Sequence, residues 1–119
     1  MNTNFNKYTF GQPHLGLVDI NTYVQSQSPT QGVNYRVTHA ADLVPQVPPH
    51  ALGGWDHYYP EYWITKVNGM PATVDIAQVT GSLYVTSGNE GDPATFLEIL
   101  EGVPQHRYYL GAITSCVSM

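Results

Sequence analysis

Two residues of this sequence carry side chains suited to proton transfer, and each lies in a loop. Asp42 follows a short strand-like run that begins at Tyr35, and Pro45 starts a stiff, proline-rich stretch after it. Loops at the ends of strands are where open α/β sheets carry their working side chains. His106 lies just past Pro104. Judged by residue type alone, Asp42 is a turn residue that bonds its own backbone and His106 is a solvated loop histidine.

A second group of residues invites a metal-binding interpretation because imidazole nitrogens and carboxylate oxygens bind zinc. Its members are His39, Asp42, His50, Asp56 and His57. Their spacing matches no helical H-x-x-x-H pattern, and the prolines between them hold them apart. We therefore expect no metal and no other cofactor, and we interpret His39 as a hydrogen-bonding residue at the end of its strand.

Composition limits the classes of partner. The chain has 119 residues, enough for one domain or part of one, and 42% of them are hydrophobic. The formal net charge of -5, with only four Lys and Arg residues, argues against nucleic acid as a partner. Charged residues make up 11%, well below the usual share of roughly 25%, which suggests an apolar face meant for burial.

Targeting and cysteine signals are sparse. We find no apolar run long enough to span a membrane and no secretory signal at the start of the chain. Cys116 is the single cysteine, so it forms no disulfide within the chain and suggests a buried thiol or a missing partner.

The hydrophobic pattern predicts an α/β arrangement. We expect three strands: one over residues 7–10, one that begins at residue 35, and one over residues 62–67. Residues 73–79 and 82–86 are expected to form a short hairpin. A crossover helix is expected over 17–24, with Leu17, Ile20, Tyr23 and Val24 on its apolar face, followed by a loop over 26–32. Asp92 and Pro93 indicate the start of a short C-terminal helix that Gly102 ends.

Four stretches, in fixed order, resemble segments of the fungal class 3 lipases, the family of triacylglycerol lipases and feruloyl esterases. Residues 8–16 are similar to the strand–turn pattern YTFGxPRxGN of that family, and residues 35–49 resemble the segment that carries its catalytic aspartate. Residues 57–64 resemble its H-x-G-x-EYW segment, and residues 106–111 the segment with its catalytic histidine. The four stretches span nearly the whole chain and cover the C-terminal part of the family domain.

The resemblance implies that Asp42 and His106 are the acid and the base of a Ser-Asp-His triad. His106 would take the proton of the serine, and Asp42 would orient the imidazole. One departure is Gln105, where the family often has Asp or Ala. The resemblance also implies a structural role for His57 near the site. If it holds, an Asp42 carboxylate oxygen lies within hydrogen-bond reach of a His106 ring nitrogen.

The nucleophile is not among these residues, since the sequence contains no G-x-S-x-G. The resemblance implies that this elbow, the oxyanion hole, the lid and a cysteine that pairs with Cys116 belong to preceding sequence. The predicted fold is therefore the C-terminal portion of an α/β-hydrolase sheet, with about three main strands, a crossover helix, a short hairpin and a short C-terminal helix, lacking the N-terminal strands.

Two functions follow as expectations. The first is a partial carboxylic ester hydrolase that acts on lipid or other esters in the complete, extracellular domain. The second is a truncated, non-catalytic binding or interaction module. We also expect association through an exposed sheet edge or Cys116. Leu43, Val44, Val47, Leu110 and Ile113 are candidates for an acyl pocket, although such spacings are typical of plain core.

Overall fold

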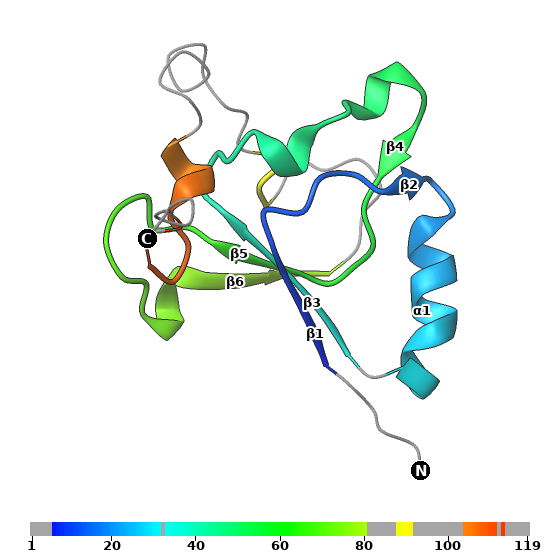
Figure 1. Ribbon diagram of the computed structural model, residues 1–119, viewed down its shortest axis with the longest axis horizontal. Coiled ribbons are helices and arrows are strands. Elements are labelled where there is room, and N and C mark those ends of the chain that lie inside the picture. Colours follow the sequence, from blue (N-terminus) through cyan, green and yellow to red (C-terminus); the bar gives the residue numbers. More distant parts are fainter. Residues whose placement is uncertain (1–5, 32, 81–87, 92–103, 112, 114–119) are drawn as a thin grey trace, which may run out of the picture.

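A four-stranded sheet lies at the centre of the computed structural model, which describes residues 6–31, 33–80, 88–91, 104–111 and 113. The strands are β1 (Lys7–Phe10), β3 (Asn34–His39), β5 (Glu61–Ile64) and β6 (Ile76–Val79), in the order β1-β3-β5-β6 (Figure 1). The first three are parallel, and β6 runs antiparallel to β5. This mostly parallel sheet confirms the predicted α/β class.

A row of tyrosines joins the three parallel strands on one face of the sheet. The rings of Tyr8 on β1 and Tyr35 on β3 stack with their centroids 4.7 Å apart. The ring of Tyr62 on β5 lies 5.3 Å from that of Tyr35. Aromatic pairs of this kind stabilise neighbouring strands by roughly 0.5–1.5 kcal/mol beyond the area they bury.

The crossover between β1 and β3 contains the helix α1 (Ile20–Gln31), which differs from the predicted helix over 17–24. Leu17 lies instead in a strand, and Tyr23 is 65% exposed, so the predicted apolar face does not pack. Polar contacts hold the helix: the backbone N–H of Tyr59 donates to Asn21 Oδ1 at 2.9 Å, and Gln25 Nε2 donates to the carbonyl oxygen of Tyr59. Much of the predicted 26–32 loop is therefore helical, because docking overrides local composition.

Short elements that the sequence did not predict surround this sheet. β2 (Gly16–Leu17) pairs antiparallel with β4 (Trp55–Asp56), and Figure 1 shows this pair close to the start of α1. The proline-rich stretch contains two 3-10 helices, η1 (Val44–Gln46) and η2 (His50–Leu52), where an extended, irregular chain was expected.

The later predictions have mixed outcomes. The strand expected over 62–67 is β5 and ends at Ile64. Of the expected hairpin, residues 73–75 form the 3-10 helix η3 (Thr73–Asp75) and residues 76–79 form β6, whereas 82–86 lie outside the described residues. The expected C-terminal helix over 92–102 and Cys116 also lie outside them.

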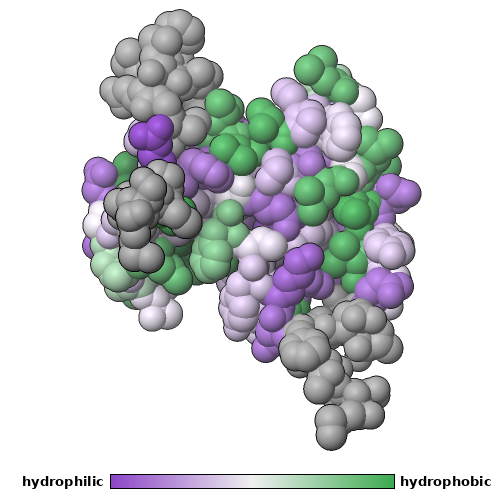
Figure 2. All heavy atoms as spheres, viewed as in Figure 1, coloured by the Kyte–Doolittle hydropathy of each residue, from purple (hydrophilic) through white to green (hydrophobic). Residues whose placement is uncertain are grey.

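The described residues form a core that is unusually polar. Its buried polar and charged members include Arg36, Thr38, His39, Asp42, Asp56, His57, Glu61 and Asn89. Apolar side chains, by contrast, are partly open to solvent, including Tyr8 at 58% and Phe10 at 42% on β1. Hydrophobic residues, coloured green, are visible at several places on the face shown in Figure 2. In the described part of the chain, no strand pairs with the outer edge of β1, and no helix is long and apolar enough to cross a membrane.

Candidate active site

Asp42 and His106 are in direct contact although they are far apart in sequence. Nδ1 of His106 lies 2.9 Å from Oδ2 of Asp42, the contact that the family resemblance implied. Asp42 follows the end of β3, in a turn closed by its own N–H, which donates to the carbonyl oxygen of His39 at 2.9 Å. His106 lies in the 3-10 helix η4 (Pro104–Arg107). The end of a central strand and a later turn of helix therefore bring an acid and a base together.

The carboxylate of Asp42 is completely buried and fixed by three donors. Its Oδ1 accepts a hydrogen bond from the backbone N–H of Val44 at 2.9 Å, which also makes Asp42 the self-bonding turn residue considered above. Its Oδ2 accepts from His106 and from the hydroxyl of Tyr109. The three contacts fix the orientation of the carboxylate, with Oδ2 facing His106.

Asn89 and Tyr109 are site residues that sequence reasoning missed. Nδ2 of Asn89 donates to the carbonyl oxygens of Ala40 at 3.0 Å and Asp42 at 2.9 Å, and this fixes the turn that carries the acid. Burial, and then the charge of Asp42, raise the pKa of Tyr109, which therefore remains a neutral donor. No local pattern marks either residue, because both act through contacts with distant parts of the chain.

The ring of His106 is oriented so that Nδ1 faces Asp42 and Nε2 is available for proton transfer. Because Nδ1 faces a carboxylate, that nitrogen carries the proton and Nε2 holds the lone pair. The side chain is 37% exposed, so the ring is accessible. Gly11 at the end of β1 packs against it: a Cβ there would lie 2.7 Å from Cε1 and Nδ1 of His106. An imidazole held in this tautomer is suited to act as a general base.

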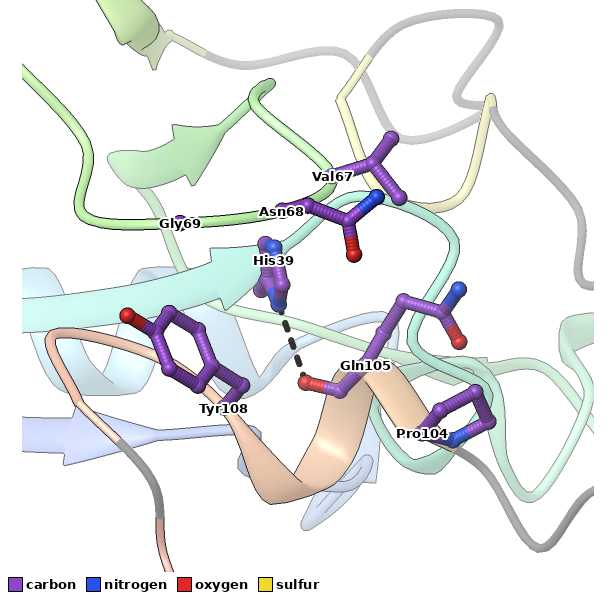
Figure 3. A pocket seen from close by; sticks show the side chains of 7 residues that line it. All are labelled: His39, Val67, Asn68, Gly69, Pro104, Gln105 and Tyr108. Carbon is purple, nitrogen blue, oxygen red and sulfur yellow. Dashed lines mark hydrogen bonds between the residues drawn. The ribbon is translucent and has the colours of Figure 1, made fainter.

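His39 connects the segment that carries His106 to the sheet, as the dashed contact in Figure 3 shows. Its Nδ1 lies 3.0 Å from the carbonyl oxygen of Gln105, and its Nε2 lies 2.8 Å from that of Lys66. His39 is therefore a hydrogen-bonding residue at a strand end, as expected. A cavity of about 510 Å³ adjoins it and is lined by His39, Val67, Asn68, Gly69, Pro104, Gln105 and Tyr108.

Arg36 and Glu61 form a buried pair of opposite charges on the sheet, and Glu61 also contacts the turn at residues 88–91. Nη2 of Arg36 lies 3.8 Å from Oε2 of Glu61, and both side chains are almost fully buried. Glu61 Oε1 accepts hydrogen bonds from the hydroxyl of Thr38 and, at 3.2 Å, from the backbone N–H of Asn89. This network joins β3 and β5 to the turn at residues 88–91, which contacts Asp42 through Asn89.

The five residues that invited a metal-binding interpretation do not converge. His39 and Asp42 are engaged as described above, and Nδ1 of His50 lies 2.8 Å from the carbonyl oxygen of Trp55. Asp56 accepts the backbone N–H of His57 at 2.8 Å. Nε2 of His57 lies 2.7 Å from the carbonyl oxygen of Pro45, beneath the Asp42 loop. Among the described residues, one different set, His14, His57 and Glu90, brings three possible ligand atoms together.

An apolar hollow of about 320 Å³ lies next to the acid and the base. Its lining consists of Phe10, Tyr109, Leu110, Gly111 and Ile113. Leu110 and Ile113 are two of the residues named above as candidates for an acyl pocket, whereas Leu43, Val44 and Val47 are not among the lining residues of this hollow. Phe10 precedes Gly11, the residue that packs against His106. An apolar group in this hollow would therefore lie near the imidazole.

Comparison with known proteins identifies relatives of one family. Residues 2–52 match the family described as lipase (class 3). The chain is 32% identical over 103 residues to the secreted mono- and diacylglycerol lipase A of Penicillium cyclopium, covering 86% of this chain and 31% of the relative. It is 37% identical over 108 residues to a lipase of Rhizomucor miehei, covering 90% of this chain and 26% of that protein.

The fold comparison agrees with the sequence comparison. A crystal structure of a mutant form of MDLA from Penicillium cyclopium superposes with a TM-score of 0.73 at 32% identity, over 89% of this chain and 36% of the other. The predicted α/β-hydrolase type of fold is thereby confirmed. The chain spans about a third of the length of these relatives.

Proposed function

This chain is related in sequence and in fold to the fungal class 3 lipases, and on that premise we propose that it supplies the acid and the base of a carboxylic ester hydrolase. Asp42 is the proposed acid and His106 the proposed base. The nucleophilic serine, its oxyanion hole and the lid come from residues outside these 119, in a domain of which this chain is the C-terminal part. The observation that carries the proposal is the 2.9 Å contact between the buried Asp42 carboxylate and Nδ1 of His106.

The proposed reaction is acyl transfer in two steps. Nε2 of His106 removes the proton from the serine hydroxyl as its oxygen attacks the ester carbonyl carbon, and then gives that proton to the departing alcohol. Water attacks the acyl-serine in the same way and releases the carboxylic acid. Asp42 keeps Nδ1 protonated and stabilises the imidazolium that forms at each step.

The proposed substrates are lipid esters in an extracellular setting. Relatives of the chain bear the name secreted mono- and diacylglycerol lipase. The apolar hollow beside Tyr109 offers a surface for an acyl chain near His106. A glycerolipid ester presents such a chain together with a polar head, so it fits an apolar surface beside a proton-transfer pair.

A second candidate function is a non-catalytic binding module. It is favoured by the absence of G-x-S-x-G from the sequence and by the solvent-exposed apolar residues next to the site, including Phe10 at 42%, Leu110 at 52% and Ile113 at 51%. Such a module would hold an acyl chain or a protein partner in the hollow without cleaving a bond.

A hybrid enzyme distinguishes the two functions. In it, this chain replaces the matching segment of the Penicillium cyclopium lipase, which supplies the rest of the domain. We expect the hybrid to hydrolyse a nitrophenyl butyrate and a monoacylglycerol, and we expect His106→Ala and Asp42→Asn each to lower kcat by at least about 10³-fold. The matched control is His50→Ala, which changes a histidine whose Nδ1 lies 2.8 Å from the local carbonyl oxygen of Trp55.

Two results would count against the proposal. A hybrid that folds cooperatively but hydrolyses no ester would favour the binding module. The 119-residue chain by itself should show no turnover above a histidine background, because it lacks the groups that give most of the rate. Saturable hydrolysis by that chain, lost in His106→Ala but kept in a variant without serines, would mean that the histidine or a water it activates performs the chemistry.

A further inference from the structure

Three side chains from separate segments meet beneath the loop that carries Asp42. His14 comes from the connection between β1 and β2, His57 from the segment after β4, and Glu90 from the turn at residues 88–91. One ring nitrogen of each histidine and one carboxylate oxygen of Glu90 all lie within 4.8 Å of one another. His14 is 5% exposed and His57 2% exposed. Nε2 of His14, Nδ1 of His57 and Oε1 of Glu90 have no hydrogen-bond partner in the described part of the chain.

The other nitrogen of each ring fixes where the lone pair lies. Nδ1 of His14 is 2.8 Å from the carbonyl oxygen of Pro48, and Nε2 of His57 is 2.7 Å from that of Pro45. A carbonyl oxygen only accepts hydrogen bonds, so both of these nitrogens carry the proton. In the neutral rings, the remaining nitrogens, Nε2 of His14 and Nδ1 of His57, therefore hold the lone pairs, and both are buried without a hydrogen-bond partner among the described residues. Backbone carbonyls hold metal-binding histidines in the same tautomer.

The contacts inside the cluster are unfavourable without a positive charge. Nε2 of His14 lies 2.5 Å from Oε1 of Glu90, yet the two atoms are not aligned as a hydrogen bond. A lone pair and a carboxylate oxygen repel each other at that distance. A contact between His14 and Glu90 alone also leaves Nδ1 of His57 buried without a hydrogen-bond partner. A cation between the three atoms would satisfy all of them at once.

We propose that His14, His57 and Glu90 bind a divalent transition-metal ion, and that Zn²⁺ is the ion that fits them best. Two imidazole nitrogens and one carboxylate oxygen form a ligand set that zinc accepts with bond lengths of about 2.0–2.2 Å. Tetrahedral bonds of that length place ligand atoms about 3.4 Å apart. Side-chain rotations would lengthen the 2.5 Å distance between Nε2 of His14 and Oε1 of Glu90. They would also shorten the largest distance between ligand atoms, which is at most 4.8 Å. Glu90, with its side chain 21% exposed, gives the ion a route from solvent.

The residue types of the cluster suit a metal ion, because imidazole nitrogens and carboxylate oxygens are both ligands that zinc accepts. The family pattern YTFGxPRxGN has arginine at the position of His14, and a guanidinium offers no lone pair to a metal. We therefore expect this site only in chains that carry histidine there.

The role that follows for the ion is structural. The ion would link three segments: the β1–β2 connection, the segment after β4 and the turn at residues 88–91. The two histidines also contact the carbonyl oxygens of Pro45 and Pro48, so the proline-rich stretch would be held with them. That turn also contains Asn89, which fixes the backbone of Asp42 through its 2.9 Å contact. The ion would thus brace the acid loop without touching substrate. Neither the site nor its test depends on ester hydrolysis.

Metal titration tests the proposal directly. The tag-free chain and the hybrid, both with Cys116→Ser so that no thiol competes, are freed of metal and titrated with ZnCl₂ against a chromophoric chelator. We expect one Zn²⁺ per chain, a higher Tm with Zn²⁺ than without, and a tetrahedral Co²⁺ absorption band when CoCl₂ replaces zinc. Glu90→Gln and His14→Gln should each weaken binding by at least about 100-fold.

The control is His50→Gln, which removes a histidine bonded to a backbone carbonyl outside the cluster and should bind Zn²⁺ like the parent. Circular dichroism of each variant checks that it is folded, and Glu90→Gln preserves the shape of a partly exposed side chain. Absence of a zinc-dependent change in Tm and of stoichiometric binding in the parent would overturn the proposal. So would binding that survives both site variants, or that is lost in His50→Gln.

Discussion

Gly11 has no side chain, and the ring of His106 lies against the position that a Cβ of residue 11 would take. Its φ of +61° lies in the left-handed region, and a Cβ added there would come within 2.7 Å of Cε1 and Nδ1 of the ring. The tight turn after β1 and the position of the proposed base therefore depend on the same missing side chain.

Gly11→Ala should destabilise the chain and displace His106. Backbone strain at a positive φ costs on the order of 1–3 kcal/mol, and the ring must also move to admit the methyl group. The measurements are a denaturant melt and kcat of the hybrid enzyme. Gly54→Ala is the matched control, since its φ is +77° but nothing lies within 4 Å of the added Cβ. Equal effects of the two substitutions on kcat would show that the contact with His106 does not matter.

Tyr109→Phe should weaken the anchoring of Asp42. The variant loses a charge-assisted hydrogen bond from a buried hydroxyl, which contributes about 1.5–3 kcal/mol, and frees one side of the carboxylate oxygen that His106 contacts. We expect lower stability at neutral pH and a lower kcat in the hybrid, with KM little changed. A kcat equal to that of the parent would mean that His106 alone is enough to orient Asp42.

The same residue predicts an alkaline effect on stability. Because burial raises the pKa of Tyr109, the unfolded chain loses this proton above about pH 10 while the folded chain keeps it. Its contribution is therefore complete below that pH and falls as the pH rises further, by up to about 1.4 kcal/mol per pH unit. Urea melts between pH 8 and 11 should show a shallower decline for Tyr109→Phe than for the parent. The exposed Tyr23→Phe is the control, and a parallel decline in all three would contradict this assignment.

The sequence predicted the parts of this structure that depend on local pattern or on quoted motifs. The runs that became β1, β3 and β5 alternate or carry β-branched residues, so their strands were predictable, and the motifs led to the contact between Asp42 and His106. Helix α1 was placed too early because Ser26, Ser28 and Pro29 favour a loop by composition. Its polar docking through Asn21 and Gln25 is a tertiary effect that no local window contains.

The rest of the site could not be predicted for a similar reason. Asn89 and Tyr109 hold Asp42 from 47 and 67 residues away, and neither is marked by a local pattern. His14, His57 and Glu90 are also widely spaced, so their convergence depends on the folded connections between strands. The metal-binding interpretation chose residues that are close in sequence, and only His57 belongs to the cluster that forms.

His39→Leu tests whether the segment with His106 is held by its link to the sheet. The substitution removes the two ring nitrogens that face the carbonyl oxygens of Gln105 and Lys66, and because a neutral imidazole donates through one nitrogen, it removes one hydrogen bond, worth about 0.5–1.5 kcal/mol. We expect lower stability and a lower kcat in the hybrid, while Asp42 stays in place. The comparison is His39→Gln, which retains a donor and should recover part of the loss. Full activity in His39→Leu would show that η4 is positioned by other contacts.

The outer edge of β1 is open in the described part of the chain, because no described strand pairs with it. The apolar side chains near this side of the sheet, Tyr8, Phe10, Leu110 and Ile113, are 42–58% exposed. An open edge and an apolar surface favour association and limit the core that 119 residues can bury. We expect the separate chain, as Cys116→Ser, to bind a hydrophobic dye, to self-associate and to melt with weak cooperativity, whereas the hybrid melts cooperatively. The measurements are dye fluorescence, sedimentation and a denaturant melt. A monomeric chain that unfolds cooperatively by several kcal/mol, with an m-value suited to its length, would show a self-sufficient fold and favour the binding module over the partial hydrolase.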